Sequence, residues 1–174
     1  IRKIYLADRL LRHDEEAVRT DLSIRPVEGI DGSASFDDIL SLLKRYGITA
    51  EKVSLWGTGR PMREFLWSEE MADACVFLME HCDFADMYPH GTQEIRNCHI
   101  NVGTGKELTI KELAELVKKT VHFEGDIIWD TGKPNGTPRK LINVDKLHRL
   151  GWTHKVEIET GVEKLYAWYQ KSLK

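Results

Sequence analysis

The chain has 174 residues, of which 41% are hydrophobic and 30% charged, and its net charge is −3. This apolar content can fill a core, which excludes a wholly disordered chain, and the acidic balance argues against a nucleic-acid binder. No apolar run approaches the roughly 18 residues that a membrane-spanning helix needs. The length suits one compact domain that binds neither nucleic acid nor membrane.

The cysteines and histidines predict neither a disulfide framework nor a metal site. The three cysteines have no Cys-x-x-Cys spacing, and no two of the seven histidines lie three or four residues apart. Free thiols are typical of a reducing compartment, so a cytoplasmic protein is expected. The chain begins at Ile1, without a methionine and inside a helical pattern, which we interpret as a cut in a longer protein.

In the first third of the chain, apolar spacing predicts a helix over 1–12 that frays through 15–19. Glycine and proline predict a loop over 21–35. Ser35 is expected to cap a short helix that ends at Gly47. The apolar face of this helix is expected to comprise Phe36, Ile39, Leu40 and Leu43.

The middle of the chain begins with a predicted strand at 53–56 and a turn at 57–61. Ser68 is expected to cap a helix with Cys75 in the core. The apolar stripe of that helix is expected to comprise Met71, Cys75, Leu78 and Met79. A strand is expected at 98–102.

The last third begins with a capping box, Thr109 and Glu112, that predicts a helix start. A strand at 126–129, a loop at 131–138 and helices near 144–150 and 157–172 complete the chain. The fold class is therefore α/β with few strands and long loops. The Gly-x-Gly-x-x-Gly loop of a dinucleotide-binding fold is absent, so no complete nucleotide-binding Rossmann sheet is expected.

The stretch 55–65 carries the clearest chemical signal. Trp56 ends a predicted strand, a Gly-Thr-Gly turn follows, and Arg63 lies just beyond. An indole offers a flat surface to a planar ring and a guanidinium pairs with phosphate oxygens, which together suit a nucleoside diphosphate. The alternative is a hairpin with Trp56 in the core and Arg63 in a surface ion pair, and spacing alone favours that alternative.

Two further groups are candidates for anion binding. The loop 133–140 carries the amide of Asn135 and the cations Lys133, Arg139 and Lys140, and it could close over the same anion. The alternative for this loop is a solvated basic loop, and the alternative for Lys3 on the first helix is a solvated polar face; the pattern alone favours both alternatives. No nucleophile and base can be paired from the sequence.

The same stretches resemble the GDP-L-fucose synthases, a family of the extended short-chain dehydrogenase/reductase superfamily. The resemblance rests on Trp-Gly-Thr-Gly-Arg-Pro-Met-Arg-Glu-Phe-Leu at 56–66, Ile-Asn-Val-Gly-Thr-Gly at 100–105, and Lys-Pro at 133–134 with Gly-Thr-Pro-Arg-Lys-Leu at 136–141. It runs from about residue 53 to the end, and 1–7 is similar to the preceding helix. Residues 12–52 look like an inserted segment.

The resemblance implies that the parent enzyme epimerises GDP-4-keto-6-deoxymannose at C3 and C5 and reduces C4 with NADPH to GDP-L-fucose. Residues 1–174 would form its C-terminal substrate-binding domain, lacking most of the Rossmann sheet. The N-terminal Rossmann domain that binds NADP(H) would be absent, together with every catalytic and cofactor-binding residue. The chain alone is therefore predicted to be inactive. The resemblance implies no metal, and a homodimer as the full enzyme.

The resemblance also implies roles for single residues. Trp56 and Arg63 lie where the family contacts the nucleotide-sugar diphosphate, and Asn135 lies where relatives often carry an aspartate that binds the substrate. Lys3 falls at a basic substrate-contacting position, and Lys140 is a candidate for the phosphates.

Two other functions stay open at this stage. The chain could be the substrate domain of another nucleotide-sugar epimerase or dehydratase. It could also be a non-catalytic interaction module, with 12–52 and the aromatic helix at 157–172 as its partner surface.

Overall fold

The chain adopts an α/β fold with few, short strands. A computed structural model describes residues 1–88, 91 and 94–174. The chain divides into two compact units: unit 1 comprises 1–61, 109–138 and 162–174, and unit 2 comprises 62–108 and 139–161. No helix among the described residues is long and apolar enough to cross a membrane.

The helices are α1 (Arg2–Leu11), α2 (Glu15–Ile24), α3 (Phe36–Arg45), α4 (Ser68–His81), the 3-10 helix η1 (Phe84–Met87), α5 (Ile110–Val121), α6 (Asp145–Arg149) and α7 (Ile158–Lys171). The strands are β1 (Lys52–Trp56), β2 (Met62–Arg63), β3 (Leu108–Thr109), β4 (Asp126–Asp130) and β5 (Arg139–Lys140).

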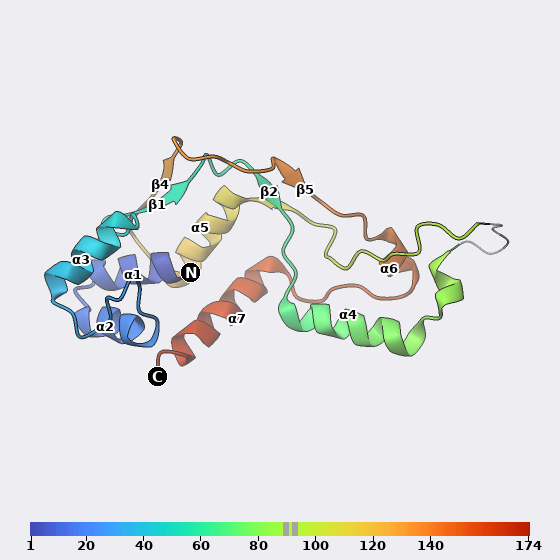
Figure 1. The fold of residues 1–174 in the computed structure, drawn as a ribbon, viewed down its shortest axis with the longest axis horizontal. Coiled ribbons are helices and arrows are strands. Elements are labelled where there is room, and N and C mark those ends of the chain that lie inside the picture. Colours follow the sequence, from blue (N-terminus) through green and yellow to red (C-terminus); the bar gives the residue numbers. More distant parts are fainter. Residues whose placement is uncertain (89–90, 92–93) are drawn as a thin grey trace. The chain divides into compact units, whose positions relative to one another are not determined.

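Unit 1 is built around the parallel pair of β1 and β4, in which Val53 lies opposite Ile127. Figure 1 shows β1 beside β4, and α1 next to α2 and α5. The side chains of Val18, Leu22 and Val53 are completely buried and form part of its core. Burial of such side chains contributes roughly 1.5–3 kcal/mol each, so the helices are held to the strands mainly by apolar contact.

The sequence prediction failed at α2, where a fraying end and a loop were expected. Asp14 accepts a hydrogen bond from the Ala17 amide at 3.1 Å and so caps a full helix. Few apolar residues mark this helix because its buried face includes a carboxylate, Asp21, between Val18 and Leu22. A count of apolar residues therefore missed the helix.

Asp21 is the centre of a buried polar network that joins three helices of unit 1. Its carboxylate, 0% exposed, accepts hydrogen bonds from Arg2 Nε of α1 at 2.7 Å and from the hydroxyl of Tyr169 of α7. The Tyr169 ring packs edge-on against the Tyr5 ring, with centroids 5.1 Å apart. The charge of the Asp21 carboxylate is balanced by Arg2, and its oxygens accept hydrogen bonds from Arg2 and Tyr169, so the network is stable despite its burial.

The Tyr169 hydroxyl predicts a loss of stability at high pH. Burial, and then the hydrogen bond and negative charge of Asp21, raise the pKa of Tyr169 above its ordinary value of 10.0. The folded state holds this proton more tightly than the unfolded state, so the stabilisation is complete below pH 10 and is lost as pH rises further. We expect the free energy of unfolding to fall above pH 10 by up to about 1.4 kcal/mol per pH unit. Denaturant unfolding at several pH values measures this slope, which should be smaller in Tyr169→Phe; an equal slope in that variant would contradict the assignment.

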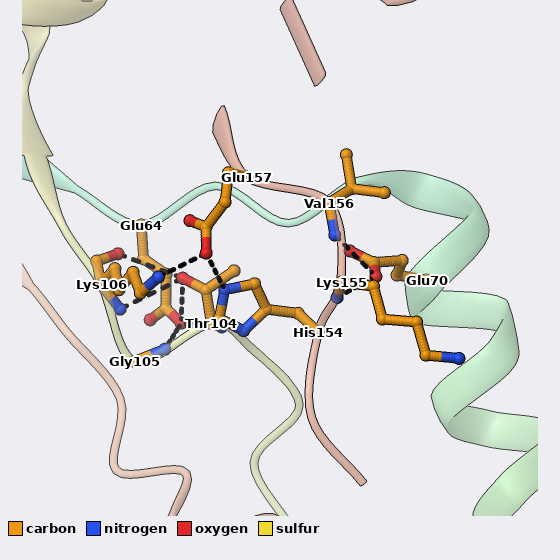
Figure 2. A network of polar contacts seen from close by, with 9 residues as sticks. All are labelled: Glu64, Glu70, Thr104, Gly105, Lys106, His154, Lys155, Val156 and Glu157. Carbon is orange, nitrogen blue, oxygen red and sulfur yellow. Dashed lines mark hydrogen bonds and ion pairs between the residues drawn. The ribbon is translucent and has the colours of Figure 1, made fainter. Parts of the chain in front are cut away.

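Unit 2 is held by a smaller core between α4 and α6. Ala74, Leu147 and Trp152 form a buried cluster, and the Trp152 indole N–H donates to the Asp73 carboxylate at 2.8 Å. β2 pairs in parallel with β5, and the sheet order is β3-β2-β5. Glu70 is buried on α4, and its carboxylate accepts the backbone amides of Lys155 and Val156, as Figure 2 shows.

Two predictions for α4 are wrong. Ser68 is the first residue of the helix, and Trp67 precedes it as the cap position without a side-chain hydrogen bond. Cys75 is exposed, as are Met71 and Met79, whereas Ala74 points into the core. The helix is apolar on several sides, so its sequence did not determine which side is buried.

The strand predicted at 98–102 is also absent from the structure. Ile100 and Val102 pack against the core cluster of unit 2, but no strand among the described residues pairs with this segment. A β-strand needs a neighbouring strand to bond its amides and carbonyls, so a strand-like sequence without a neighbour stays irregular.

The remaining elements agree with the predictions more closely. Ser35 caps α3 by accepting the Asp38 amide at 3.2 Å, although Leu42 is buried in place of Leu40. The predicted capping box at the start of α5 is present. On α7, Val162 and Tyr169 are buried, while Leu165 and Trp168 are exposed.

Candidate functional site

In unit 1, the end of β1 places an exposed aromatic side chain next to a tight turn. Trp56 is 69% exposed, which contradicts the alternative that buries it in a core. Gly57 and Gly59 follow with φ values of +81° and +71°, a region that glycine enters without strain. A Cβ on Gly57 would lie 2.5 Å from Asn135 Oδ1, so the turn can approach the loop at 133–140 only with glycine there.

Asn135 is attached to this turn by two hydrogen bonds. Its side-chain oxygen accepts from the Thr58 backbone amide at 2.7 Å and from the Thr58 hydroxyl at 3.0 Å. The structure thus brings two predicted site residues, Trp56 and Asn135, onto adjoining loops of one unit. Both side chains are exposed.

Lys133, on the same loop as Asn135, adds a positive charge to this surface. Its Nζ lies 5.5 Å from the centre of the Trp56 ring, within the range of a cation–π contact. An exposed indole, an ammonium and an amide together can bind a planar base or a sugar next to an anion. We call Trp56, Thr58, Lys133 and Asn135 the indole platform.

Lys3 lies in unit 1 but makes its contacts elsewhere. Its Nζ donates to the Tyr46 carbonyl at 2.8 Å and approaches the Ser54 carbonyl at 3.5 Å. Ser54 lies on β1, two residues before Trp56. Partial burial lowers the pKa of Lys3. These bonds leave Lys3 serving the backbone of unit 1, and within the described residues none of its hydrogen bonds is to the indole platform.

Arg63 and Lys140 lie together in unit 2, opposite each other on the paired strands β2 and β5. The Arg63 guanidinium donates to the neighbouring Met62 carbonyl at 2.6 Å, and no ion pair involves Arg63 among the described residues. Lys140 is exposed. Arg139, by contrast, is held by the Glu107 carboxylate, whose hydrogen bond and charge raise the pKa of the guanidinium. In the part of the chain that the structure describes, the other two cations of this loop, Lys133 and Lys140, form no ion pair with an acid.

The sequence analysis missed Glu64, which organises unit 2 next to Arg63. One carboxylate oxygen accepts the backbone amides of Thr104 at 2.5 Å and Gly105 at 2.8 Å (Figure 2). The other oxygen accepts the Ile142 amide at 3.3 Å. A Cβ on Gly103 would lie 2.2 Å from this carboxylate. An acid after Arg63 and the distant Gly-Thr-Gly at 103–105 were the only signals in the sequence.

The chain is similar in sequence and fold to sugar-nucleotide enzymes. Residues 32–103 match the NAD dependent epimerase/dehydratase family. A putative GDP-L-fucose synthase 2 of Arabidopsis thaliana is 48% identical over 124 residues, 71% of this chain and 34% of that protein. The GDP-L-fucose synthase of Escherichia coli (strain K12) is 42% identical over 135 residues, 75% of this chain and 41% of that protein. The chain therefore spans less than half the length of these relatives.

Solved structures extend the similarity to nearly the whole chain. A GDP-6-OMe-4-keto-L-xylo-heptose reductase from C. jejuni matches with a TM-score of 0.86 and 34% identity, over 98% of this chain and 46% of that one. A GDP-mannoheptose C4 reductase from Campylobacter jejuni, with NADP bound, matches with a TM-score of 0.80 and 34% identity. The match covers 97% of this chain and 44% of that one. The resemblance to GDP-L-fucose synthases within the extended short-chain dehydrogenase/reductases is confirmed.

Proposed function

We propose that this chain is the substrate-binding part of a GDP-sugar epimerase and reductase of the GDP-L-fucose synthase type. The observation that carries the proposal is the exposed Trp56 of the indole platform, held beside Lys133 and Asn135 in a chain 48% identical to a plant relative of that name. In this proposal Trp56 and Asn135 of unit 1 contact the nucleotide sugar, whereas substrate-contacting roles for Arg63, Lys140 and Lys3 rest on the family resemblance alone.

The redox and epimerisation steps are proposed to belong to a further domain of the parent protein. NADPH, bound there, would supply the hydride for reduction at C4. The chain has no Gly-x-Gly-x-x-Gly loop, so its own residues do not fit this cofactor and no step is assigned to them. The chain alone is therefore proposed to bind substrate without turning it over.

The exposed side of α4 supports a contact with that further domain. Met71, Val76 and Met79 form an apolar stripe, and Met79 is 79% exposed. Single helices seldom leave such a stripe in water, so a covering surface is expected in the parent.

The three cysteines are free, which supports a reducing cytoplasm as the setting. The full enzyme is proposed to be a homodimer, and 12–52, which forms α2 and α3, to be an insertion.

Calorimetric titration of the purified chain with GDP, and separately with UDP as the comparison nucleotide, tests the proposal. We expect GDP-selective binding that weakens about tenfold or more in Trp56→Ala and in Arg63→Ala, because an aromatic contact and a charge-assisted hydrogen bond are lost.

Trp168→Ala is the matched control, since Trp168 is also exposed, at 59%, but lies on α7, which carries none of the predicted site residues. A preference for UDP would contradict the GDP-sugar assignment in favour of another nucleotide-sugar epimerase or dehydratase. Equal loss of binding in Trp168→Ala would contradict the placement of the site.

A further inference from the structure

One loop of unit 1 contains a pair of residues whose side chain and backbone can react with each other. Asn135 is followed by Gly136, whereas the other asparagines of the chain, Asn97, Asn101 and Asn143, are followed by cysteine or valine. The backbone nitrogen that follows an asparagine can attack the side-chain amide carbon, and a glycine has no Cβ to obstruct the approach. Asn135 is therefore the asparagine most open to such an attack.

The structure presents this pair to water with the attacking group free. Asn135 and Gly136 are both exposed, and Gly136 has a φ of +72°, a region that few other residues adopt. In the part of the chain that the structure describes, the Gly136 amide donates no hydrogen bond. No acceptor within the chain holds its nitrogen, so water or hydroxide can remove the proton.

Thr58 polarises the carbonyl group that would be attacked. The Asn135 side-chain oxygen accepts from the Thr58 backbone amide at 2.7 Å and from the Thr58 hydroxyl at 3.0 Å. Donors at such distances stabilise the negative charge that develops on a carbonyl oxygen when a nucleophile adds to its carbon. The two donors of Thr58 thus face the atom on which this charge would form.

We propose that Asn135 is a site of spontaneous deamidation and that the two donors of Thr58 promote the reaction. The Gly136 nitrogen loses its proton to water or hydroxide and forms a bond to Cγ of Asn135. The bond between Cγ and the side-chain nitrogen breaks, and ammonia leaves with a proton taken from solvent. Water then opens the five-membered imide at either of its carbonyl groups, which gives aspartate or isoaspartate.

The two products change the indole platform in different ways. Aspartate adds a negative charge to the loop that carries Lys133, and its carboxylate still offers an oxygen to both donors of Thr58. Isoaspartate routes the backbone through Cβ, which lengthens the loop by one atom and displaces the carboxylate from its place beside Thr58. Formation of isoaspartate therefore releases this loop from the turn at 57–59.

Incubation of the purified chain at neutral pH and body temperature, followed by peptide mapping with mass spectrometry, tests the inference. We expect the mass increase of an amide-to-acid exchange at Asn135 and none at Asn97, Asn101 or Asn143 over the same period. The aspartate and isoaspartate peptides are separated by chromatography. The rate should rise with pH, because the attacking nitrogen must first lose its proton.

Three variants test the roles of the neighbouring residues. Gly136→Ala adds a Cβ beside the attacking nitrogen and should slow the reaction about tenfold or more. Thr58→Val keeps the backbone donor but removes the hydroxyl, so the reaction should be about fivefold slower. Thr58→Ser keeps both donors and is the matched control, which should react at the natural rate.

No mass increase at Asn135, or an equal increase at the other asparagines, would overturn the inference. An unchanged or faster reaction in Thr58→Val would overturn it as well, because the hydroxyl would then not promote the attack. The experiment contains no nucleotide, so its failure is distinct from failure of the proposed function.

Discussion

Replacing Asp21 with alanine should lower the free energy of unfolding of the chain by about 3–5 kcal/mol, the usual cost of breaking a buried ion pair by removing one partner. The carboxylate is completely buried and accepts from Arg2 and from the Tyr169 hydroxyl. Its removal leaves a guanidinium and a hydroxyl without their acceptor at the junction of α1, α2 and α7. Denaturant unfolding followed by circular dichroism measures the change.

Two variants make this expectation specific to the network. Tyr169→Phe removes one donor and leaves Asp21 paired with Arg2, so it should cost only about 1 kcal/mol. Glu124→Ala removes an exposed carboxylate from the same unit and should change stability by less than about 0.5 kcal/mol. If Asp21→Ala were no more destabilising than Glu124→Ala, the network would not be a determinant of the fold.

Replacing Glu64 with alanine is the second large effect, a loss of about 2 kcal/mol of stability in unit 2. The carboxylate accepts three backbone amides, from Thr104, Gly105 and Ile142. The amide of the buried Thr104 would lose its partner at a cost of about 1–3 kcal/mol, whereas the exposed Gly105 and Ile142 amides can bond water instead. Glu64→Gln should cost less, about 1 kcal/mol, because its amide oxygen can keep the first two bonds while its NH₂ faces the Ile142 amide.

The Glu64 variants also test how Arg63 and Lys140 are held. Glu64 follows Arg63 directly and bonds Ile142, two residues after Lys140, so it secures the register of β2 with β5. Amide hydrogen exchange at Thr104, Gly105 and Ile142 should accelerate in Glu64→Ala and remain near the natural rate in Glu80→Ala, which removes an exposed acid of α4. Unchanged exchange in Glu64→Ala would contradict this role.

Elements with a signal confined to a few neighbouring residues were predicted correctly. The caps at Ser35 and Thr109 and the strand at β1 depend on hydrogen bonds or alternation within one turn or strand, so the sequence contains the information. The length suggested one domain, whereas the chain divides into two units. Local patterns missed three features: the burial of the Asp21 carboxylate, the side of α4 that faces the core, and the lack of a partner strand for 98–102. All three depend on packing between segments that are distant in the sequence.

The candidate site divides in the same way. Its residue types, an indole at Trp56, an amide at Asn135 and cations at Arg63 and Lys140, were recognised from the sequence by itself because their chemistry depends only on side-chain identity. Only the tertiary structure decided that Thr58 occupies the oxygen of Asn135, 77 positions away, and that Glu64 holds the Thr104 amide, 40 positions away. Such bonds form when separate loops meet, and the free energy that selects their partners comes from the packed fold rather than from neighbouring residues in the chain.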